Sequence, residues 1–409
     1  MFDAEYAASL AKRLAAAPRF AGTSGERKAR DLLLNELSQA GLEAIAEPFR
    51  VRTFKVNACR LESIDPPFQV PCSPLGFSGE TGPEGVTGDV IYIESVDKAL
   101  TPSREGWIGL ASRRPGKDEW RRIVGKASGL IIAEDNRYRL PSHVAVPYEW
   151  REKYGSLPSM YVSYGDAIRL LSSKKARIVL EQKYLRPLSY NVVAEKRGTK
   201  YPDEIILVTA HYDSVYGVRG AVDNAGGTAF AVALARAFAQ RDSKRTLRVA
   251  LFSGEELGLR GSQAYVKRHR EELDKIKLVL NLDVHGDAIG RNGAVVTGPK
   301  ELKDYAESRA KILGYTISFR EDVMSSDGTS FAREGVPVLN LYRAGGTNID
   351  MHTVRDRGDH ISPLAYRILG AYAETLLDEL LNAETIPFPH SIPEELSKKV
   401  KEYFSRWEV

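Results

Sequence analysis

The sequence predicts an α/β fold in which a mostly parallel mixed sheet is flanked by helices and interrupted by an inserted β-rich domain. From about residue 188, short apolar runs alternate with helical stretches, the pattern of a largely parallel sheet covered by helices. Between about 58 and 187, prolines and glycines punctuate short apolar runs that are typical of strands in a separate unit. The length of 409 residues fits two or three domains of this kind.

The chain is accordingly divided into four parts. Residues 1–57 open the α/β domain with two helices, the second ending before Gly41, a residue suited to a helix C-cap. Residues 58–187 form the inserted domain, and residues 188–385 complete the α/β domain. Residues 386–409 are a charged, proline-started tail that we expect to end in a surface helix.

Composition argues against several classes of protein. The net charge of +4, from 58 basic and 54 acidic residues, is small, and the one basic cluster is broken by acids, so we expect no nucleic-acid partner. No apolar run reaches 18 residues, and the N-terminus resembles an amphipathic helix rather than a signal peptide. Cys59 and Cys72 are too few for a disulfide framework; they could pair, but free thiols suit a cytosolic protein. We expect a cytoplasmic protein without membrane contact and leave homo-oligomer formation open.

Polar residues follow the expected strands at their carboxyl ends, where open α/β sheets bind ligands. The apolar run 205–208 leads to His211 and Asp213, whose side chains point to one side of an extended chain, so Asp213 could orient the imidazole. Alone, His-x-Asp is more often structural. Asp223 precedes a helix expected at 228–240 and would usually be an N-cap, although nearby glycines permit unusual backbone there.

Three further groups lie at comparable places. Glu255 and Glu256 follow the strand expected at 247–252, and Asp283 follows the strand at 278–282. His352 lies in a loop before the helix expected at 364–382. A solvated loop or a structural histidine would explain each group singly. Together, two histidines and several carboxylates suit zinc, and with one bridging carboxylate they serve two ions ~3.5–4 Å apart.

Five stretches in this order, VTAHYDSV, AVDNAGGTA, LFSGEELGLRGS, LNLDVHG and MHTVRD, resemble the co-catalytic di-zinc aminopeptidase and glutamate carboxypeptidase family of peptidase clan MH. The resemblance covers 188 to about 385 and the opening segment around RFAGTSGERKARDLLLNEL. It implies the zinc exopeptidase, phosphorylase/hydrolase-like fold. VTGDVIYIE, GKASGLIIAEDN and LPSMYVSYGDAIRLL resemble, more weakly, a protease-associated domain.

Carried over by position, the resemblance implies metal and catalytic roles. His211, Asp223 and Asp283 match the ligands of one Zn²⁺, and Glu256, His352 and the shared Asp223 those of the second; Co²⁺ or Mn²⁺ could substitute. Glu255 matches the general base that activates a metal-bridging water, and Asp213 the partner of His211. The peptide bond after Asp223 is expected to be cis.

The implied activity is removal of N-terminal residues from peptides by a metallo-aminopeptidase. A glutamate carboxypeptidase type is an alternative, with Arg343 or Arg355 binding a substrate carboxylate, but its tyrosine before the last ligand is replaced by Met351. A one-zinc glutaminyl cyclase and a non-catalytic receptor or scaffold are further alternatives. Tyr342 is a candidate to steady the oxyanion or a packing residue.

Overall fold

A computed structural model describes residues 1–407 as two compact units. The first unit contains residues 1–51, 188–348 and 356–405, and the second contains 52–187, 349–355 and 406–407. The first boundary comes after Val51, before the position at 57 that we expected, because residues 53–65 form one continuous strand. The short segment 349–355 groups with the second unit although both its neighbours belong to the first.

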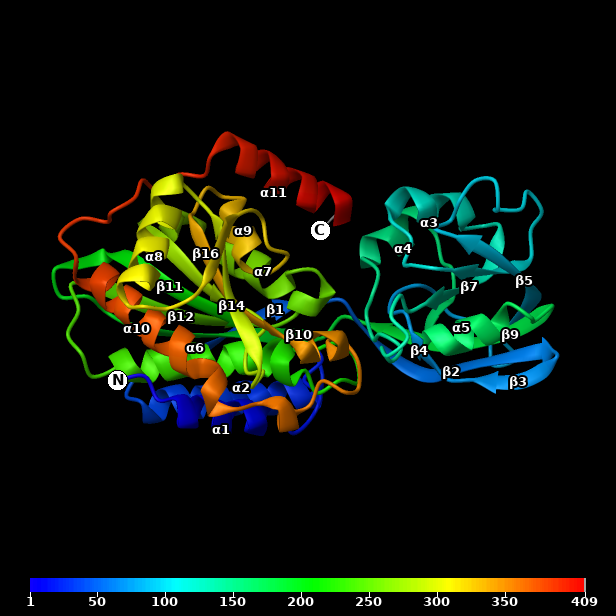
Figure 1. The fold of residues 1–409 in the computed structure, drawn as a ribbon, viewed down its shortest axis with the longest axis horizontal. Coiled ribbons are helices and arrows are strands. Elements are labelled where there is room, and N and C mark those ends of the chain that lie inside the picture. Colours follow the sequence, from blue (N-terminus) through cyan, green and yellow to red (C-terminus); the bar gives the residue numbers. More distant parts are fainter. Residues whose placement is uncertain (408–409) are drawn as a thin grey trace. The chain divides into compact units, whose positions relative to one another are not determined.

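The sheet of the first unit has eight strands in the order β1-β10-β12-β11-β13-β16-β14-β15 (Figure 1). The strands are β1 (Glu43–Arg50), β10 (Leu188–Lys196), β11 (Tyr201–His211), β12 (Arg245–Phe252), β13 (Ile276–Leu282), β14 (Gly290–Thr297), β15 (Ser318–Glu321) and β16 (Val338–Gly345). The four central strands β12, β11, β13 and β16 are parallel, whereas β10 and β14 run antiparallel to them. The predicted mixed, mostly parallel sheet is confirmed, with antiparallel strands added on both sides.

Helices cover both faces of this sheet (Figure 1). They are α1 (Ala4–Leu14), α2 (Ser24–Gln39), α6 (Gly226–Phe238), α7 (Arg260–Arg268), α8 (Lys300–Ile312), α9 (Gly328–Ala332), α10 (Arg367–Asn382) and α11 (Glu394–Trp407). Helices α1, α2, α6, α8 and α10 share one hydrophobic core with the sheet, while α7 and α9 pack on each other. Helix α6 is buried along nearly its whole length, which its alanine-rich sequence GGTAFAVALARAF permits.

The second unit has its own eight-stranded sheet, in the order β3-β2-β9-β5-β6-β7-β8-β4. Its strands are β2 (Thr53–Asp65), β3 (Pro67–Val70), β4 (Cys72–Pro74), β5 (Val86–Glu94), β6 (Trp107–Ala111), β7 (Ala127–Ala133), β8 (Ser159–Val162) and β9 (Lys175–Leu185), and its helices are α3 (Lys117–Ile123), α4 (Tyr148–Tyr154) and α5 (Tyr164–Leu170). The unit is β-rich as expected, but β5 to β8 are parallel and helices connect some of them.

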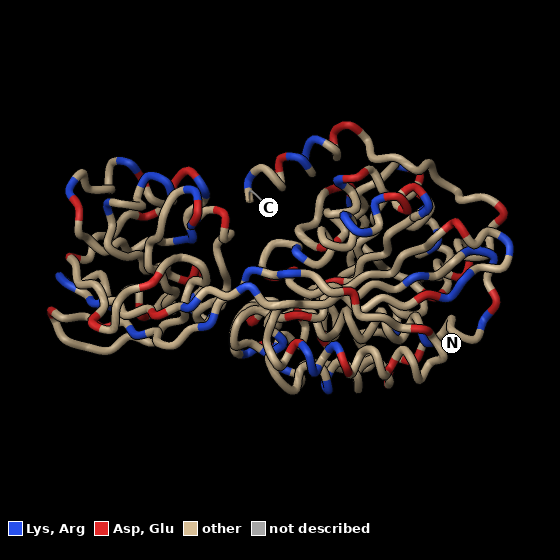
Figure 2. Tube along the Cα trace, turned by 180° about the vertical axis from the view of Figure 1, so that it is seen from behind, with Lys and Arg blue, Asp and Glu red and all other residues tan. Residues whose placement is uncertain are grey.

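Charged residues of both signs are interspersed along the trace in each unit, as Figure 2 shows. The expected absence of a nucleic-acid partner agrees with this distribution and stays a prediction. Among residues 1–407, no helix has the length and apolar character that crossing a membrane requires.

Candidate metal centre

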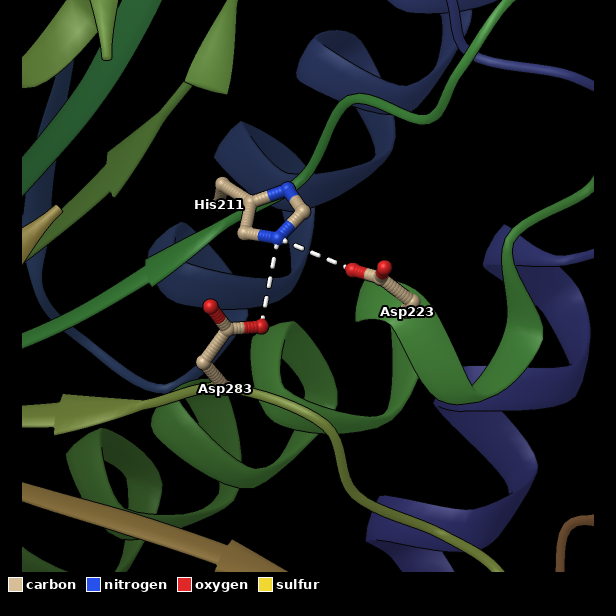
Figure 3. Close-up of side chains that lie close together, drawn as sticks. All are labelled: His211, Asp223 and Asp283. Carbon is tan, nitrogen blue, oxygen red and sulfur yellow. Dashed lines mark hydrogen bonds and ion pairs between the residues drawn. The ribbon is translucent and has the colours of Figure 1, made fainter. Parts of the chain in front are cut away.

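Three predicted ligands meet at the carboxyl ends of β11 and β13 (Figure 3). His211 ends β11, Asp283 directly follows β13, and Asp223 lies in the turn of π-helix η1 (Ala221–Ala225) that leads into α6. The Nε2 atom of His211 lies 3.1 Å from Asp223 Oδ1 and 3.3 Å from Asp283 Oδ1. One ligand atom from each residue lies within 4.8 Å of the other two, and all three side chains are buried.

The turn that carries Asp223 is held from both sides. Asp356 accepts hydrogen bonds from the backbone N–H groups of Val222 (2.8 Å) and Asp223 (3.1 Å). Asn224 donates to Leu282 O at 2.9 Å and accepts from Val284 N at 3.2 Å, which fastens the turn to the end of β13. The Asp223–Asn224 peptide bond is cis, as the family resemblance implied. Asp356 stands in the quoted MHTVRD stretch, but sequence reasoning gave it no role.

His211 is oriented by groups around its ring. Its Nδ1 atom faces Asp213 Oδ1 at 3.5 Å, and its backbone carbonyl accepts a 2.6 Å hydrogen bond from Thr228 Oγ1 in α6. Burial alone would lower the pKa of His211, but the charges of Asp283 and Glu255 raise it well above its usual range. The ring therefore directs Nε2 toward the carboxylates of Asp223 and Asp283.

The two adjacent glutamates occupy 3₁₀-helix η2 (Glu255–Leu257), which follows β12. The backbone N–H of Glu255 donates to Asp213 Oδ1 at 3.2 Å, and its Oε2 atom lies 4.0 Å from His211 Nε2. Burial raises the pKa of Glu255 well above the usual value, as do the charges of Glu256 and Asp283. An oxygen of Glu256 lies within 4.8 Å of one of Asp223, so the two glutamates serve different places in the site.

The donor set fits a divalent cation. Several carboxylates lie within a few ångströms of one another with little solvent, an arrangement whose mutual repulsion a bound cation relieves. Asp327, at the start of α9, is fully buried, and the charges of Asp213 and Asp283 act on it together with that of His211. Imidazole nitrogen and carboxylate oxygen are ligands that zinc prefers. Sequence reasoning gave Asp327 no role.

Comparison with known families gives these positions a context. Residues 191–377, which include every candidate ligand and Glu255, match peptidase family M28. The match spans most of the α/β unit and the catalytic positions of all five predicted motifs, and it covers slightly less than half of the chain. The predicted recognition, made from five short stretches, is thereby confirmed for the α/β unit.

Individual relatives of the M28 region extend over most of the chain. Aminopeptidase YwaD of Bacillus subtilis is 25% identical over 421 residues, covering 98% of this chain and 90% of that protein. Carboxypeptidase Q of Bos taurus is 27% identical over 353 residues, covering 79% of this chain and 74% of that protein. The solved structure of BSAP, a zinc aminopeptidase from Bacillus subtilis, superposes with a TM-score of 0.79 at 24% identity, over 97% of this chain and 99% of that chain, which shows the shared fold.

The remaining predicted M28 ligand, His352, lies in the segment that groups with the second unit. Its backbone has a φ of 59°, and its carbonyl accepts a 2.8 Å hydrogen bond from the backbone N–H of His143 in the same unit. Arg139 donates to the carbonyls of Ile349 and Met351 at 3.1 and 2.8 Å. These bonds fix the backbone around His352, and its service as a ligand stays a prediction.

Two other candidates from the M28 region are engaged in packing. An ideal Cβ at Gly293 would lie 2.2 Å from Tyr342 Cζ, so the Tyr342 ring lies directly over the neighbouring strand β14. Arg343 uses its guanidinium to donate to Asp287 O (2.8 Å), Asn292 Oδ1 (2.8 Å) and Ala288 O (3.1 Å). Both side chains therefore pack against β14 or the segment that leads into it.

Proposed function

We propose that this chain is a zinc-dependent aminopeptidase that removes N-terminal residues from peptides. One observation carries the proposal. His211, Asp223 and Asp283 form a buried group with Glu255 beside it, and this group lies at the carboxyl ends of central strands in the region that matches peptidase family M28. The similarity to aminopeptidase YwaD along nearly the whole of both chains supports the same activity.

The proposal assigns two zinc ions. His211, Asp223 and Asp283 would hold one ion, and Asp223, Glu256 and His352 the other, with Asp223 shared. The short distance between oxygens of Asp223 and Glu256 supports a second ion next to the first. The Bacillus subtilis protein whose solved structure shares this fold is also a zinc aminopeptidase. Co²⁺ or Mn²⁺ would suit the same nitrogen and oxygen ligands.

Bound zinc supplies Lewis acidity, lowering the pKa of a water ligand to ~7 and polarising a substrate carbonyl. Glu255 lies close enough to His211 Nε2 to accept a proton from a water at the centre and to return it to the leaving amine. Its raised pKa favours holding that proton between the two steps. Asp213 has a positioning role. Its carboxylate faces the His211 ring and accepts a hydrogen bond from the backbone N–H of Glu255, so it orients both residues.

Aminopeptidase activity is favoured over the carboxypeptidase alternative by the charge of the site. A free substrate amine is attracted to a cluster of carboxylates, whereas a substrate carboxylate needs a cation to receive it. Arg343, one cation considered for that role, already makes three hydrogen bonds to its neighbours. Arg355 donates to the Tyr138 carbonyl at 3.0 Å.

The test combines substrate choice with metal analysis. Aminoacyl-anilides with a free amine, the same anilides with an acetylated amine, and dipeptides with an amide-capped or a free carboxylate are assayed with and without a chelator. We expect turnover of free-amine substrates alone, its loss on chelation, and two zinc ions per chain by elemental analysis. Turnover of blocked-amine dipeptides only, or a folded, zinc-supplied protein that holds no metal, contradicts the proposal.

Other parts of the proposal concern the chain as a whole. We propose that the second unit is related to protease-associated domains and takes part in shaping substrate access. We also propose a cytoplasmic location, in which Cys59 and Cys72, whose Sγ atoms lie 3.6 Å apart, stay reduced. Peptides are the proposed partners; homo-oligomer formation stays open.

A further inference from the structure

Arg19 lies in the segment between α1 and α2, outside the residues that match family M28, and its side chain is buried with 1% exposure. Within residues 1–407, the guanidinium donates to backbone carbonyls alone: Tyr212 O at 2.7 Å, Leu14 O at 3.0 Å, Gly220 O at 2.8 Å and Arg219 O. A buried arginine without a hydrogen-bonded carboxylate is uncommon, because the cation has lost its hydration.

The acceptors of Arg19 identify what it joins. Tyr212 lies between His211 and Asp213, so one bond fixes the backbone directly after β11. Arg219 and Gly220 come immediately before η1, the turn that presents Asp223. The backbone N–H of Arg19 also donates to Ser214 Oγ at 3.0 Å, and that hydroxyl donates to Val218 O at 2.8 Å. One side chain thus connects the two loops that carry two predicted ligands.

The positive charge of Arg19 is balanced by nearby carboxylates to which it is not hydrogen-bonded. Burial lowers the pKa of Arg19 to about 10, while the charges of Asp356, Asp213 and Asp223 act in the opposite direction. The guanidinium is therefore a fixed cation inside an acidic cluster. Its hydrogen bonds go to backbone carbonyls and not to these carboxylates, so their oxygens stay available to a metal.

We propose that Arg19 is a positioning residue of the metal centre, setting the separation between the loop after His211 and the turn that carries Asp223. This inference rests on the proposed zinc site and goes beyond it, because it gives the N-terminal segment a role in metal binding. The planar fork of five N–H donors lets one arginine reach carbonyls on both loops and on α1. Lysine keeps the charge but has one ammonium group, which cannot span the same acceptors.

Arg19→Lys therefore separates position from charge. If position matters, the dissociation constant for Zn²⁺, measured by competition with a chromophoric chelator, should rise roughly 10–100-fold, the usual effect of losing a group that orients metal ligands. If charge alone matters, the lysine variant should bind zinc as the unaltered chain does. Thermal unfolding of the chelated proteins reports stability separately.

Arg245→Lys is the matched control. Arg245 is equally buried at the start of β12, the strand whose other end leads to Glu255, and it donates to the carbonyls of Leu380 and Ala383 and to Glu204. We expect this variant to lose stability but to keep its zinc affinity. A rise in the zinc dissociation constant only for Arg19→Lys supports the inference.

Three outcomes would overturn parts of this scheme distinguishably. Unchanged zinc affinity in folded Arg19→Lys refutes the positioning role while leaving the zinc site intact. Equal weakening in both lysine variants assigns the effect to general loss of stability and also refutes it. No zinc binding by the unaltered chain refutes the proposed function itself.

If Arg19→Lys does not fold, Ser214→Ala is tested in its place. This variant removes the hydroxyl that accepts from the Arg19 backbone N–H and donates to Val218 O. A weaker zinc affinity supports the positioning role, and an unchanged affinity refutes it.

Discussion

Two sites with buried acidic groups, one in each unit, are built differently. In the second unit, Glu134 is 5% exposed, its Oε2 atom lies 2.9 Å from Arg139 Nε, and its Oε1 atom accepts a 2.7 Å hydrogen bond from Ser142 N. In the first unit, Asp223 and Asp283 face one histidine nitrogen, and the carboxylate of Asp327 is fully buried under the influence of the charges of Asp213 and Asp283. The first arrangement pairs its carboxylate directly with an arginine, whereas the second directs several carboxylates at one imidazole, as the proposed metal site requires.

The contrast teaches how function is recognised in a buried cluster. A buried carboxylate costs several kcal/mol unless it is paired and hydrogen-bonded, so structural acids bring their own cation. A group of buried acids without a directly paired cation lowers the stability of the fold, and such groups are typical of binding or catalytic sites. Both kinds of site occur in this chain, so substitutions of acid by amide should change stability in opposite directions at Glu134 and at Asp327.

The largest effect is expected at Glu255. Glu255→Gln keeps the size of the side chain and leaves every predicted ligand in place, but the amide cannot accept a proton. Turnover of a free-amine anilide should fall by about 10²–10⁴-fold, the usual contribution of general acid–base catalysis. Zinc content per chain should stay unchanged. Asp223→Ala, the companion variant, should lose zinc as well as activity.

Full activity in Glu255→Gln would remove Glu255 from the mechanism. If Glu255→Gln also lost zinc, Glu255 would be a metal ligand, and the proposed ligand set would gain one residue.

Much of this comparison could be predicted from the sequence. Apolar runs ending in His211, Glu255 and Asp283 indicated a sheet edge, because each run is long and continuous enough to be a buried strand. The mixed α/β fold followed from the alternation of apolar runs and helical stretches, and the cis bond after Asp223 followed from the family resemblance; both agree with the structure.

Other features could not be read in advance. Strand β14, with its sequence GRNGAVVT, begins with glycines and polar residues that hide its length. Arg19 and Asp356 act on backbone groups about 200 and 130 positions away, and no local pattern reveals such partners. The burial of Asp327 depends on packing from several elements, which only three-dimensional structure reveals.

A smaller effect is expected at Glu134. Glu134→Gln removes the charge opposite Arg139 and weakens the bond from Ser142, so the free energy of unfolding should fall by about 1–3 kcal/mol. Zinc content should not change. Asp89→Asn is the control, because Asp89 pairs with Arg104 at 2.8 Å on the surface and should cost ~1 kcal/mol or less. Equal stability of Glu134→Gln and the unaltered chain in urea titrations would show that the pair does not stabilise the unit.

The opposite sign is expected at Asp327. Burial raises its pKa to about 7, and the charges of Asp213 and Asp283 act in the same direction. The folded, chelated protein thus holds this proton at pH values where the unfolded chain, with a pKa near ~3.9, has released it. Stability must then decrease as pH rises from ~4 to ~7, since the folded state binds more protons across that window.

Asp327→Asn has no proton to release, so the chelated variant should escape this decrease. We expect its unfolding free energy at pH 8 to exceed that of the unaltered chain by about 1–2 kcal/mol, with the difference shrinking toward pH 4. Added zinc should narrow the gap, because a cation stabilises the ionised carboxylate that asparagine lacks. A variant that is less stable than the unaltered chain at pH 8 without metal would mean that Asp327 is paired as Glu134 is, and the contrast between the two units would not hold.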